Sequence, residues 1–334
     1  MGASVVGSGH PPRPADEESP RKPGAACSHR AIAPIALFVY NRPWHAARAI
    51  DALMKNPLSR DSDLFIFSDG ARGSADREAV EQVRRRLREL DGFRCVHWVY
   101  RDRNLGLAES IIAGVSEVLA SRDRVIVVED DIVASPHFLR FMNDALERYQ
   151  DDERVISVHG YVYPIGVKHR PPAFFLRDTG CWGWATWRRG WNLFEPDGAK
   201  LLAAIEQRGL ADEFDFNCSY PFTQMLRDQI RGRNGSWAIR FQAAAFLLGK
   251  LTLYPGVSLV ENIGHDGSGE HCDAGTGSFE VQLTETLPVL AALPVEESRE
   301  MRQAYEIFFR GLRAPLPRRV WARMARAIGS LRPA

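Results

Sequence analysis

The chain has 334 residues, 45% apolar and 25% charged, which is enough apolar material for a packed core and excludes a chain that is disordered throughout. Lys and Arg number 43 and Asp and Glu 42, so the charge balance gives no sign of a polyanion partner, and we expect no nucleic acid to bind. The length permits one large α/β enzyme with an elaborated second half and a tail.

The cysteines indicate a reducing compartment. They are five in number, scattered, and without a C-x-x-C pair, which argues against a disulfide framework and a structural zinc site. We therefore expect a cytoplasmic protein. The five are Cys27, Cys95, Cys181, Cys218 and Cys272.

The two ends of the chain differ from its middle. Residues 1–30 are rich in Pro, Gly, Ser and charge and lack the apolar run of a signal peptide, so we predict a disordered tail. No segment approaches the ~18 consecutive apolar residues of a membrane helix. Near the C-terminus, a helical apolar face ringed by arginines predicts either peripheral contact with the anionic inner membrane or a helix packed on the domain with a solvated rim. Its apolar positions are Val320, Trp321, Met324, Ala327 and Ile328, and its basic ones Arg318, Arg319, Arg323 and Arg326.

From residue 32 onward, segments typical of strands alternate with segments typical of helices. Apolar β-branched runs predict buried strands, and apolar residues at helical spacing predict helices. Repeated strand–helix units form a parallel sheet with right-handed crossovers, so the carboxyl ends of the strands meet at one edge. The expected strands are 32–41, 63–70, 94–102 and 124–129, and the expected helices are 45–54, 75–90, 107–121 and one that begins near Ser135 as N-cap and Pro136.

Polar residues follow all four predicted strands at that edge. Asn, Asp and Gly are ordinary turn residues, so one such group alone needs no function. The three carboxylates after the fourth strand are different, because adjacent carboxylates raise each other's pKa unless a cation compensates them. The groups are Tyr40-Asn41-Arg42, Ser68-Asp69-Gly70, Asn104-Leu105-Gly106 and Glu129-Asp130-Asp131.

Glycine-rich phosphate-binding sequences are absent from the chain. Neither G-x-G-x-x-G after the first strand nor G-x-x-x-x-G-K-[ST] occurs. A hard divalent cation held by carboxylate oxygens neutralises a diphosphate instead, and Mn²⁺ or Mg²⁺ is the natural candidate. The strand-end acids therefore predict a metal-bound diphosphate substrate.

The triplet Glu129-Asp130-Asp131 at the end of the fourth strand resembles the DxD-type motif of GT-A nucleotide-sugar glycosyltransferases, in the E-D-D form of N-acetylglucosaminyltransferase I and its relatives. PIALFVYNRPWHAARAIDAL, RDRNLGLAESI and DDIVASPHFLRFM are similar to segments of that group. GCWGWATWRRGW and SWAIRFQAAAFLLGKLTLYPGVSLVENIGHDGSGEHC are more loosely similar to related bacterial glycosyltransferases.

This resemblance implies a GT-A-type, Rossmann-like α/β fold: a mostly parallel sheet flanked by helices, with an acceptor-binding second half. We expect a catalytic domain over residues 31–275, divided into a nucleotide-binding half (31–132) and an acceptor half (133–275). Residues 276–334 would form a C-terminal helical extension.

The resemblance also implies roles for the strand-end residues. Asp131 would bind the metal, Asp130 the ribose or a metal-bound water, and Glu129 would approach the donor sugar. Asp69 would contact the uracil or its ribose, and Arg103 would hold Asp69 or a phosphate. The other implied donor-binding residues are Tyr40, Asn41 and Arg42 of the nucleotide loop and Asn104.

Two segments of the second half add candidate ligands. Aromatic faces suit sugar rings and glycines let a backbone approach a ligand, so we expect Trp182 and Gly183 in the donor-sugar or acceptor pocket, although core packing also explains the Trp cluster around them. His265, in NIGHDGSGEHC, would complete the metal shell or bind the diphosphate, unless this is a mobile polar loop without a ligand. A zinc site of His265, His271 and Cys272 lacks a fourth ligand and is discounted.

Transfer with inversion needs a base beside the acceptor hydroxyl. Asp228 is the only carboxylate between Asp215 and Glu261, and we assign it that role. The alternative is a surface acid paired with Arg227 or Arg231.

Together these predictions describe a Mn²⁺- or Mg²⁺-dependent glycosyltransferase of the hexosyltransferase type. It would move a sugar from a nucleotide-sugar donor, UDP-GlcNAc by resemblance alone, to a glycan or lipid-linked acceptor, with inversion, in surface-polysaccharide biosynthesis. One alternative is a nucleotidyltransferase that makes a nucleotide sugar, although the first loop, YNRPWH, is not glycine-rich. The other is a carbohydrate-binding module without catalysis, which would not need so many strand-end polar groups.

Overall fold

The structure is a computed structural model, and it describes residues 32–267 and 277–312. These residues belong to one compact unit, Ile32–Ala334. The predicted disordered tail (1–30) and the basic face of the predicted C-terminal helix (318–328) lie outside the described residues.

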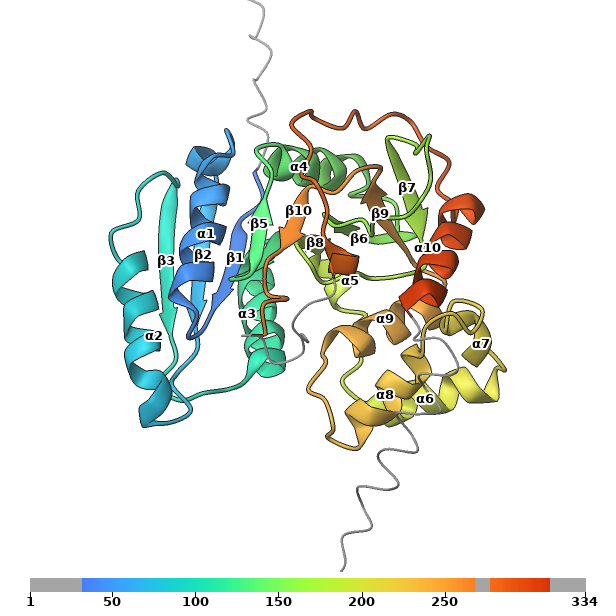
Figure 1. The fold of residues 1–334 in the computed structure, drawn as a ribbon, viewed down its shortest axis with the longest axis horizontal. Coiled ribbons are helices and arrows are strands. Elements are labelled where there is room, and N and C mark those ends of the chain that lie inside the picture. Colours follow the sequence, from blue (N-terminus) through green and yellow to red (C-terminus); the bar gives the residue numbers. More distant parts are fainter. Residues whose placement is uncertain (1–31, 268–276, 313–334) are drawn as a thin grey trace, which may run out of the picture. The chain divides into compact units, whose positions relative to one another are not determined.

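An eight-stranded sheet runs through this unit in the order β3-β2-β1-β4-β8-β6-β9-β7 (Figure 1). The first four strands in this order pair in parallel, β6 pairs in parallel with β9, and only β8 and β7 run against their neighbours. The strands are β1 Ile35–Val39, β2 Asp63–Ser68, β3 Cys95–Tyr100, β4 Arg124–Glu129, β6 Val155–His159, β7 Ala173–Leu176, β8 Trp184–Trp187 and β9 Leu251–Pro255. The predicted α/β class, with a mostly parallel sheet flanked by helices, is confirmed.

Helices cover both faces of the sheet, so the side chains on both faces of a central strand such as β1 are buried. Ile35, Leu37 and Val39 of β1 join one apolar cluster with residues of α1, α2 and α4, whereas Ala36 and Phe38 join another with residues of α3 and α9. Successive side chains of a strand point to opposite faces, so a strand that is covered twice must be apolar throughout. The helices are α1 Pro43–Met54, α2 Ser74–Leu87, α3 Leu107–Ser121, α4 Phe138–Arg148, α5 Arg188–Trp191, α6 Gly198–Gln207, α7 Ala211–Phe214, α8 Phe222–Ile230, α9 Ala238–Leu247 and α10 Arg299–Leu312, with 3₁₀ turns at Ser59–Asp61 and Gly277–Phe279.

The segment after β4 differs from its prediction. Residues Ile132–Ala134 form a short strand, β5, which pairs antiparallel with β10, Val260–Asn262. Helix α4 then begins at Phe138 rather than at Pro136, and the Ser135 hydroxyl accepts a hydrogen bond from the His137 N–H at 3.3 Å. The pairing of β5 with a distant strand delays the helix and brings the segment after β10 to the end of β4.

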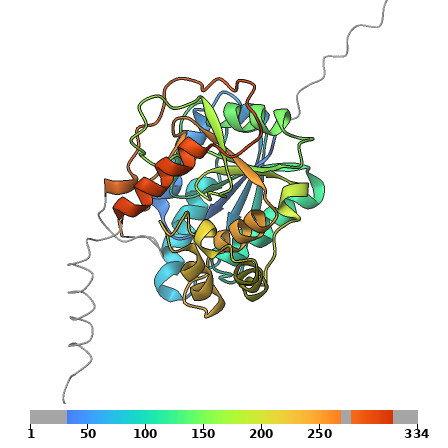
Figure 2. The ribbon, with the colours of Figure 1, turned by 90° about the vertical axis from the view of Figure 1, so that its right-hand side faces the viewer.

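Helix α10 packs on the second half of the chain, beside β7 (Figures 1 and 2). Tyr305 and Phe309 lie in an apolar cluster with residues of α6, α8 and α9 and with Tyr254 of β9. The Ser298 N–H donates to the Phe175 carbonyl at 2.9 Å, which fixes the start of the helix against β7. Residues 299–312 therefore share a core with the second half.

Candidate functional site

A buried acidic edge lies at the carboxyl end of β4. Val125–Val128 are fully buried, and the strand delivers Asp130 and Asp131 into the turn that follows, where they are 4% and 8% exposed. Buried carboxylates require hydrogen bonds or an opposite charge. Their partners therefore decide what this edge can do.

Arg42, in the loop between β1 and α1, is the partner of both aspartates. Its Nη2 donates to Asp130 and lies 2.9 Å from Oδ2 of Asp131. Because β1 and β4 pair in parallel, their carboxyl ends, and hence these side chains, meet at one edge. Arg42 Nη1 is buried without a hydrogen-bond partner among the described residues. One guanidinium thus pairs with two carboxylates, next to a third in Glu129.

Arg42 alone does not offset the negative charge of Glu129, Asp130 and Asp131. Burial, followed by the charges of Asp131 and Asp130, raises the pKa of Glu129 to about 8. Burial also raises the pKa of Asp130 to about 6, although Arg42 opposes that shift. A bound cation would therefore stabilise the charged form of these carboxylates.

The segment after β10 closes over Asp131. The Ile263 N–H donates to the Asp131 carbonyl at 2.9 Å, and a Cβ atom added at Gly264 would lie 2.4 Å from Oδ2 of Asp131, so the segment passes tightly over this carboxylate. The next residue, His265, has a buried Nε2 without a hydrogen-bond partner in the described chain. Its ring stacks on Phe279 and meets Trp182 edge-on at 5.3 Å.

The donor set fits a hard divalent cation. Carboxylate oxygens from Asp130 and Asp131 and an unpartnered imidazole nitrogen from His265 are ligands that Mn²⁺ accepts. Within residues 32–267 and 277–312, no three His, Cys, Asp or Glu side chains already surround one point. Binding would therefore require Arg42 to give up part of its hold on the aspartates. His271 and Cys272 lie outside the described residues.

The predicted nucleotide loop is held by two residues that the sequence did not single out. Asp76, in the first turn of α2, accepts hydrogen bonds from the Tyr40 hydroxyl at 2.8 Å and from Asn41 Nδ2 at 3.2 Å. Arg72 donates from its backbone to the Tyr40 hydroxyl and from Nε to Asn104 Oδ1 at 3.3 Å. The polar groups that follow β1, β2 and β3 are thus joined by hydrogen bonds, as expected for residues at one edge of a parallel sheet.

Asp69 lies at the centre of this edge, with its carboxylate turned toward backbone amides. It accepts from the N–H groups of Gly70, Leu105 and Gly106 at 2.9 Å each. Gly70 packs against the Arg103 backbone, where an added Cβ would lie 2.5 Å from the carbonyl carbon. The Arg103 side chain is exposed, and Asp69 is held by these amides instead of by Arg103. The predicted contact of Asp69 with a nucleotide stays a prediction.

The Trp cluster divides between the core and the site. Trp184, Trp191 and Trp237 pack together under α3 and α9, and Trp187 donates from Nε1 to the Leu146 carbonyl. Trp182 instead lies against Tyr161 and His265. Gly183 has φ +61°, and a Cβ there would lie 2.9 Å from Val260, so glycine is required where the chain turns past β10. Trp182 and Gly183 are therefore the part of the cluster that adjoins the acidic edge.

A second buried polar group adjoins Trp182, and sequence reasoning missed it. The Trp182 N–H donates to Nε2 of His159 at 3.2 Å, and burial lowers the pKa of His159 to about 3, so this imidazole is neutral. Asp178 accepts from the Tyr254 hydroxyl at 2.9 Å, and burial raises the pKa of Asp178 to about 6. No local pattern marks these residues, because they belong to separate strands and loops.

Asp228 is not part of the acidic edge. It lies on α8, which Figure 1 shows beside α6 and α9 and away from β5, the strand that follows the acidic edge. Its Oδ1 accepts from Gln224 at 3.0 Å and from Arg233 at 3.2 Å, and its side chain is 30% exposed. The role of Asp228 as base stays a prediction, and it would require Asp228 to exchange these partners for the acceptor.

Comparison with known proteins yields only distant similarities. No protein-family model and no curated protein matches the chain. The mannosyltransferase PcManGT from Pyrobaculum calidifontis in complex with GDP-Man and Mn²⁺ is 13% identical, with a TM-score of 0.37, over 66% of this chain and 70% of that chain. TarS from S. aureus is 16% identical, with a TM-score of 0.28, over 42% of this chain and 24% of that chain. Similarity at this level carries no argument about activity, and the function proposed below rests on the site.

Among the described residues, we find no helix that is long and apolar enough to span a membrane.

Proposed function

We propose that this protein is a divalent-metal-dependent glycosyltransferase that takes its sugar from a nucleotide-sugar donor. The observation that carries the proposal is the acidic edge itself. Asp130 and Asp131 are buried and share one arginine, and the segment that passes over Asp131 continues to His265, whose buried Nε2 has no partner among the described residues. If the edge were only structural, its buried negative charge would exceed the positive charge of Arg42. A bound cation would offset the aspartates, and the diphosphate that it carries would offset Arg42.

Each part of the edge has a distinct task in this proposal. Asp131, Asp130 and His265 would hold Mn²⁺ or Mg²⁺, which supplies charge neutralisation of the leaving diphosphate. Tyr40, Asn41, Arg42 and Asn104 would line the nucleotide, while Asp69 holds the loop 104–106 in place through its amides. Arg42 is well placed to move between the aspartates and a phosphate, because guanidinium binds both bidentately.

The donor sugar would lie between Glu129 and Trp182. In the metal-free protein burial and the charges of Asp131 and Asp130 raise the pKa of Glu129 to about 8. A cation on those aspartates would favour the charged carboxylate, which can accept a hydrogen bond from a sugar hydroxyl. Trp182 offers an aromatic face to the ring. The finer assignments rest on the sequence resemblance: UDP-GlcNAc as donor, a glycan or lipid-linked acceptor, inversion with Asp228 as base, surface-polysaccharide biosynthesis, and a cytoplasmic location with peripheral membrane contact.

Thermal unfolding with nucleotides tests the proposal. The Tm would be measured with UDP, GDP, CMP, dTDP and their sugars, each with Mn²⁺ or with EDTA, for the wild type and Asp131→Asn. Asp123→Asn is the matched control, because Asp123 flanks the opposite end of β4 and its side chain is 90% exposed. We expect one nucleotide to raise the Tm only with Mn²⁺, in the wild type and the control but not in Asp131→Asn.

Two outcomes would contradict the proposal. Stabilisation by no nucleotide under any condition would favour a carbohydrate-binding module. Formation of a nucleotide sugar from a nucleoside triphosphate and a sugar phosphate, with pyrophosphate as the leaving group, would instead identify a nucleotidyltransferase.

A further inference from the structure

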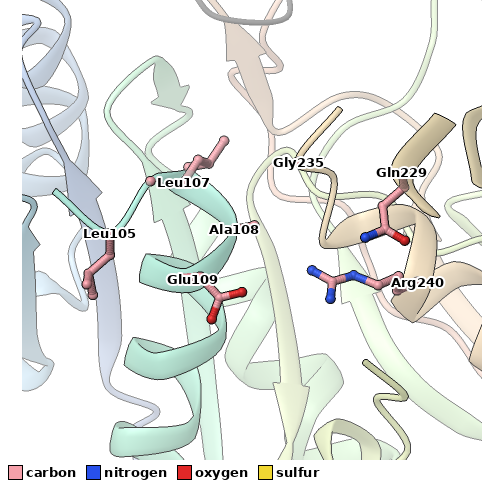
Figure 3. A pocket seen from close by; sticks show the side chains of 8 residues that line it. Leu105, Leu107, Ala108, Glu109, Gln229, Gly235 and Arg240 are labelled. Carbon is pink, nitrogen blue, oxygen red and sulfur yellow. The ribbon is translucent and has the colours of Figure 1, made fainter. Parts of the chain in front are cut away.

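A cavity of about 360 Å³ opens between the N-terminal end of α3 and the segment that joins α8 to α9 (Figure 3). Leu105, Leu107 and Ala108 supply apolar surface on the α3 side, and Gly235 brings bare backbone from the other side. This volume lies within the range of small-molecule sites, which runs from roughly 300 to 1,000 Å³. The cavity adjoins the loop that Asp69 holds, because Leu105 and Gly106 belong to both.

Two opposite charges face each other across this cavity. Figure 3 shows the Glu109 carboxylate, on the first turn of α3, and the Arg240 guanidinium, on α9, directed toward each other. They are not close enough for an ion pair of their own: Arg240 donates from Nη1 to the Pro196 carbonyl at 3.2 Å and lies over the Phe194 ring. Burial lowers the pKa of Arg240, and the charge of Glu109 opposes that shift.

Arg240 keeps an unused donor at this place. The residue is 8% exposed, and its buried Nε has no hydrogen-bond partner in the described part of the chain. Gln229 of α8 directs its amide to the same space (Figure 3). A buried donor without a partner is unfavourable, so such a group usually serves a ligand or a water.

The lining selects the chemistry of the ligand. A phosphate or carboxylate would suit Arg240 and the free amides at the start of α3, but it would meet the negative charge of Glu109. A neutral ligand with several hydroxyl groups satisfies both sides, because each hydroxyl can donate to Glu109 or accept from Arg240 and Gln229. The apolar surface of Leu105 and Leu107 suits the C–H face of a sugar ring.

We infer that this cavity binds a neutral sugar residue, with Glu109, Gln229 and Arg240 as specificity-determining residues. The inference rests on the proposed function only in taking the sugar as that of the acceptor, because the donor sugar would lie between Glu129 and Trp182, outside this cavity.

Saturation-transfer NMR with methyl glycosides of glucose, mannose and N-acetylglucosamine tests the inference. We expect millimolar binding of at least one glycoside to the wild type, and a loss of about tenfold or more in Glu109→Leu and in Gln229→Leu, because each change removes a hydrogen-bonding group from the ligand. Glu117→Leu is the matched control, since Glu117 lies on the same helix and its side chain is 51% exposed and pairs with Arg101. Circular dichroism would verify that the variants fold.

Three results would overturn the inference: no glycoside binding at tens of millimolar, equal binding by all variants, or displacement of the glycoside by inorganic phosphate. The nucleotide experiment on the same samples separates the two proposals. Glycoside binding without metal-dependent nucleotide binding would refute the proposed transferase function but not the assignment of the cavity. Metal-dependent nucleotide binding without glycoside binding would refute the assignment of the cavity but not the transferase function. We expect Gln229→Leu to lose glycoside binding and to keep the affinity difference between a nucleotide sugar and its nucleotide, because the cavity holds the acceptor sugar. Loss of that difference would contradict the acceptor assignment.

Discussion

Arg42 places its Nη2 atom 2.9 Å from Oδ2 of Asp131, 89 positions later in the chain, and the same nitrogen donates to Asp130. This guanidinium is the internal counter-ion of the acidic edge. A bound cation would have to share the aspartates with it, so loss of Arg42 should weaken the folded protein and strengthen its response to metal.

Arg42→Met tests that relationship. Removing one partner of a buried ion pair typically costs about 3–5 kcal/mol, so we expect a loss of that order in the free energy of unfolding in EDTA at pH 8, with Mn²⁺ restoring part of it. Urea unfolding with and without Mn²⁺ measures both effects. Arg85→Met is the control: the side chains of Arg85 and its partner Glu78 are 56% and 70% exposed, and we expect a loss within about 1 kcal/mol. Equal losses in the two variants would contradict the prediction.

Glu129 should make stability depend on pH. In the folded protein its pKa is raised to about 8 from an ordinary 4.5, so between these values the unfolded chain releases a proton that the folded protein keeps. The free energy of unfolding of the wild type relative to Glu129→Gln should therefore fall as pH rises through this interval, by at most about 1.4 kcal/mol per pH unit, and level off above it. Urea unfolding in EDTA at a series of pH values measures the difference, with exposed Glu117→Gln as control. Parallel curves for wild type and Glu129→Gln would refute the assignment.

Gly264→Ala should displace Asp131 without unfolding the protein. The new Cβ would lie 2.4 Å from Oδ2 of Asp131 and 3.1 Å from Oδ1 of Asn262, so the carboxylate or the segment after β10 must move. We expect Mn²⁺ to bind at least about tenfold more weakly, as measured by isothermal titration calorimetry. Gly166→Ala, where nothing lies within 4 Å of the added Cβ, is the control. Unchanged Mn²⁺ affinity in Gly264→Ala would exclude Asp131 as a ligand.

Asp228→Asn distinguishes a base from a surface acid. If Asp228 accepts the proton of the acceptor, sugar transfer should fall by about 10²-fold or more while the nucleotide-dependent rise in Tm persists. If it serves only its ion pair, Asp228→Asn and Arg233→Met should both leave transfer unchanged and shift stability by less than about 1 kcal/mol. The measurement is the rate of release of the nucleoside diphosphate from the nucleotide sugar that stabilises the protein.

Much of the edge could be predicted from the sequence because its signals are local. Apolar runs marked β1, β2 and β4, and the polar groups that follow them had to meet once the strands paired in parallel. The partners of those groups could not be predicted in the same way. Asp76 looks like an ordinary acid in the first turn of a helix, and only the packing of α2 brings it to Tyr40 and Asn41.

The alternation of strands and helices, and the three acids at the end of a buried strand, follow from the sequence alone, because apolar runs and their spacing are properties of neighbouring residues. The pairing of Arg42 with two of these acids appears only in the folded chain, as does the pairing of β5 with β10, which brings the segment before His265 over Asp131. The tertiary structure also decided that Trp182 joins the site while Trp184 enters the core, and that Asp228 pairs with Arg233. Such contacts join residues far apart in the chain, and they depend on how whole elements pack, which no local pattern encodes.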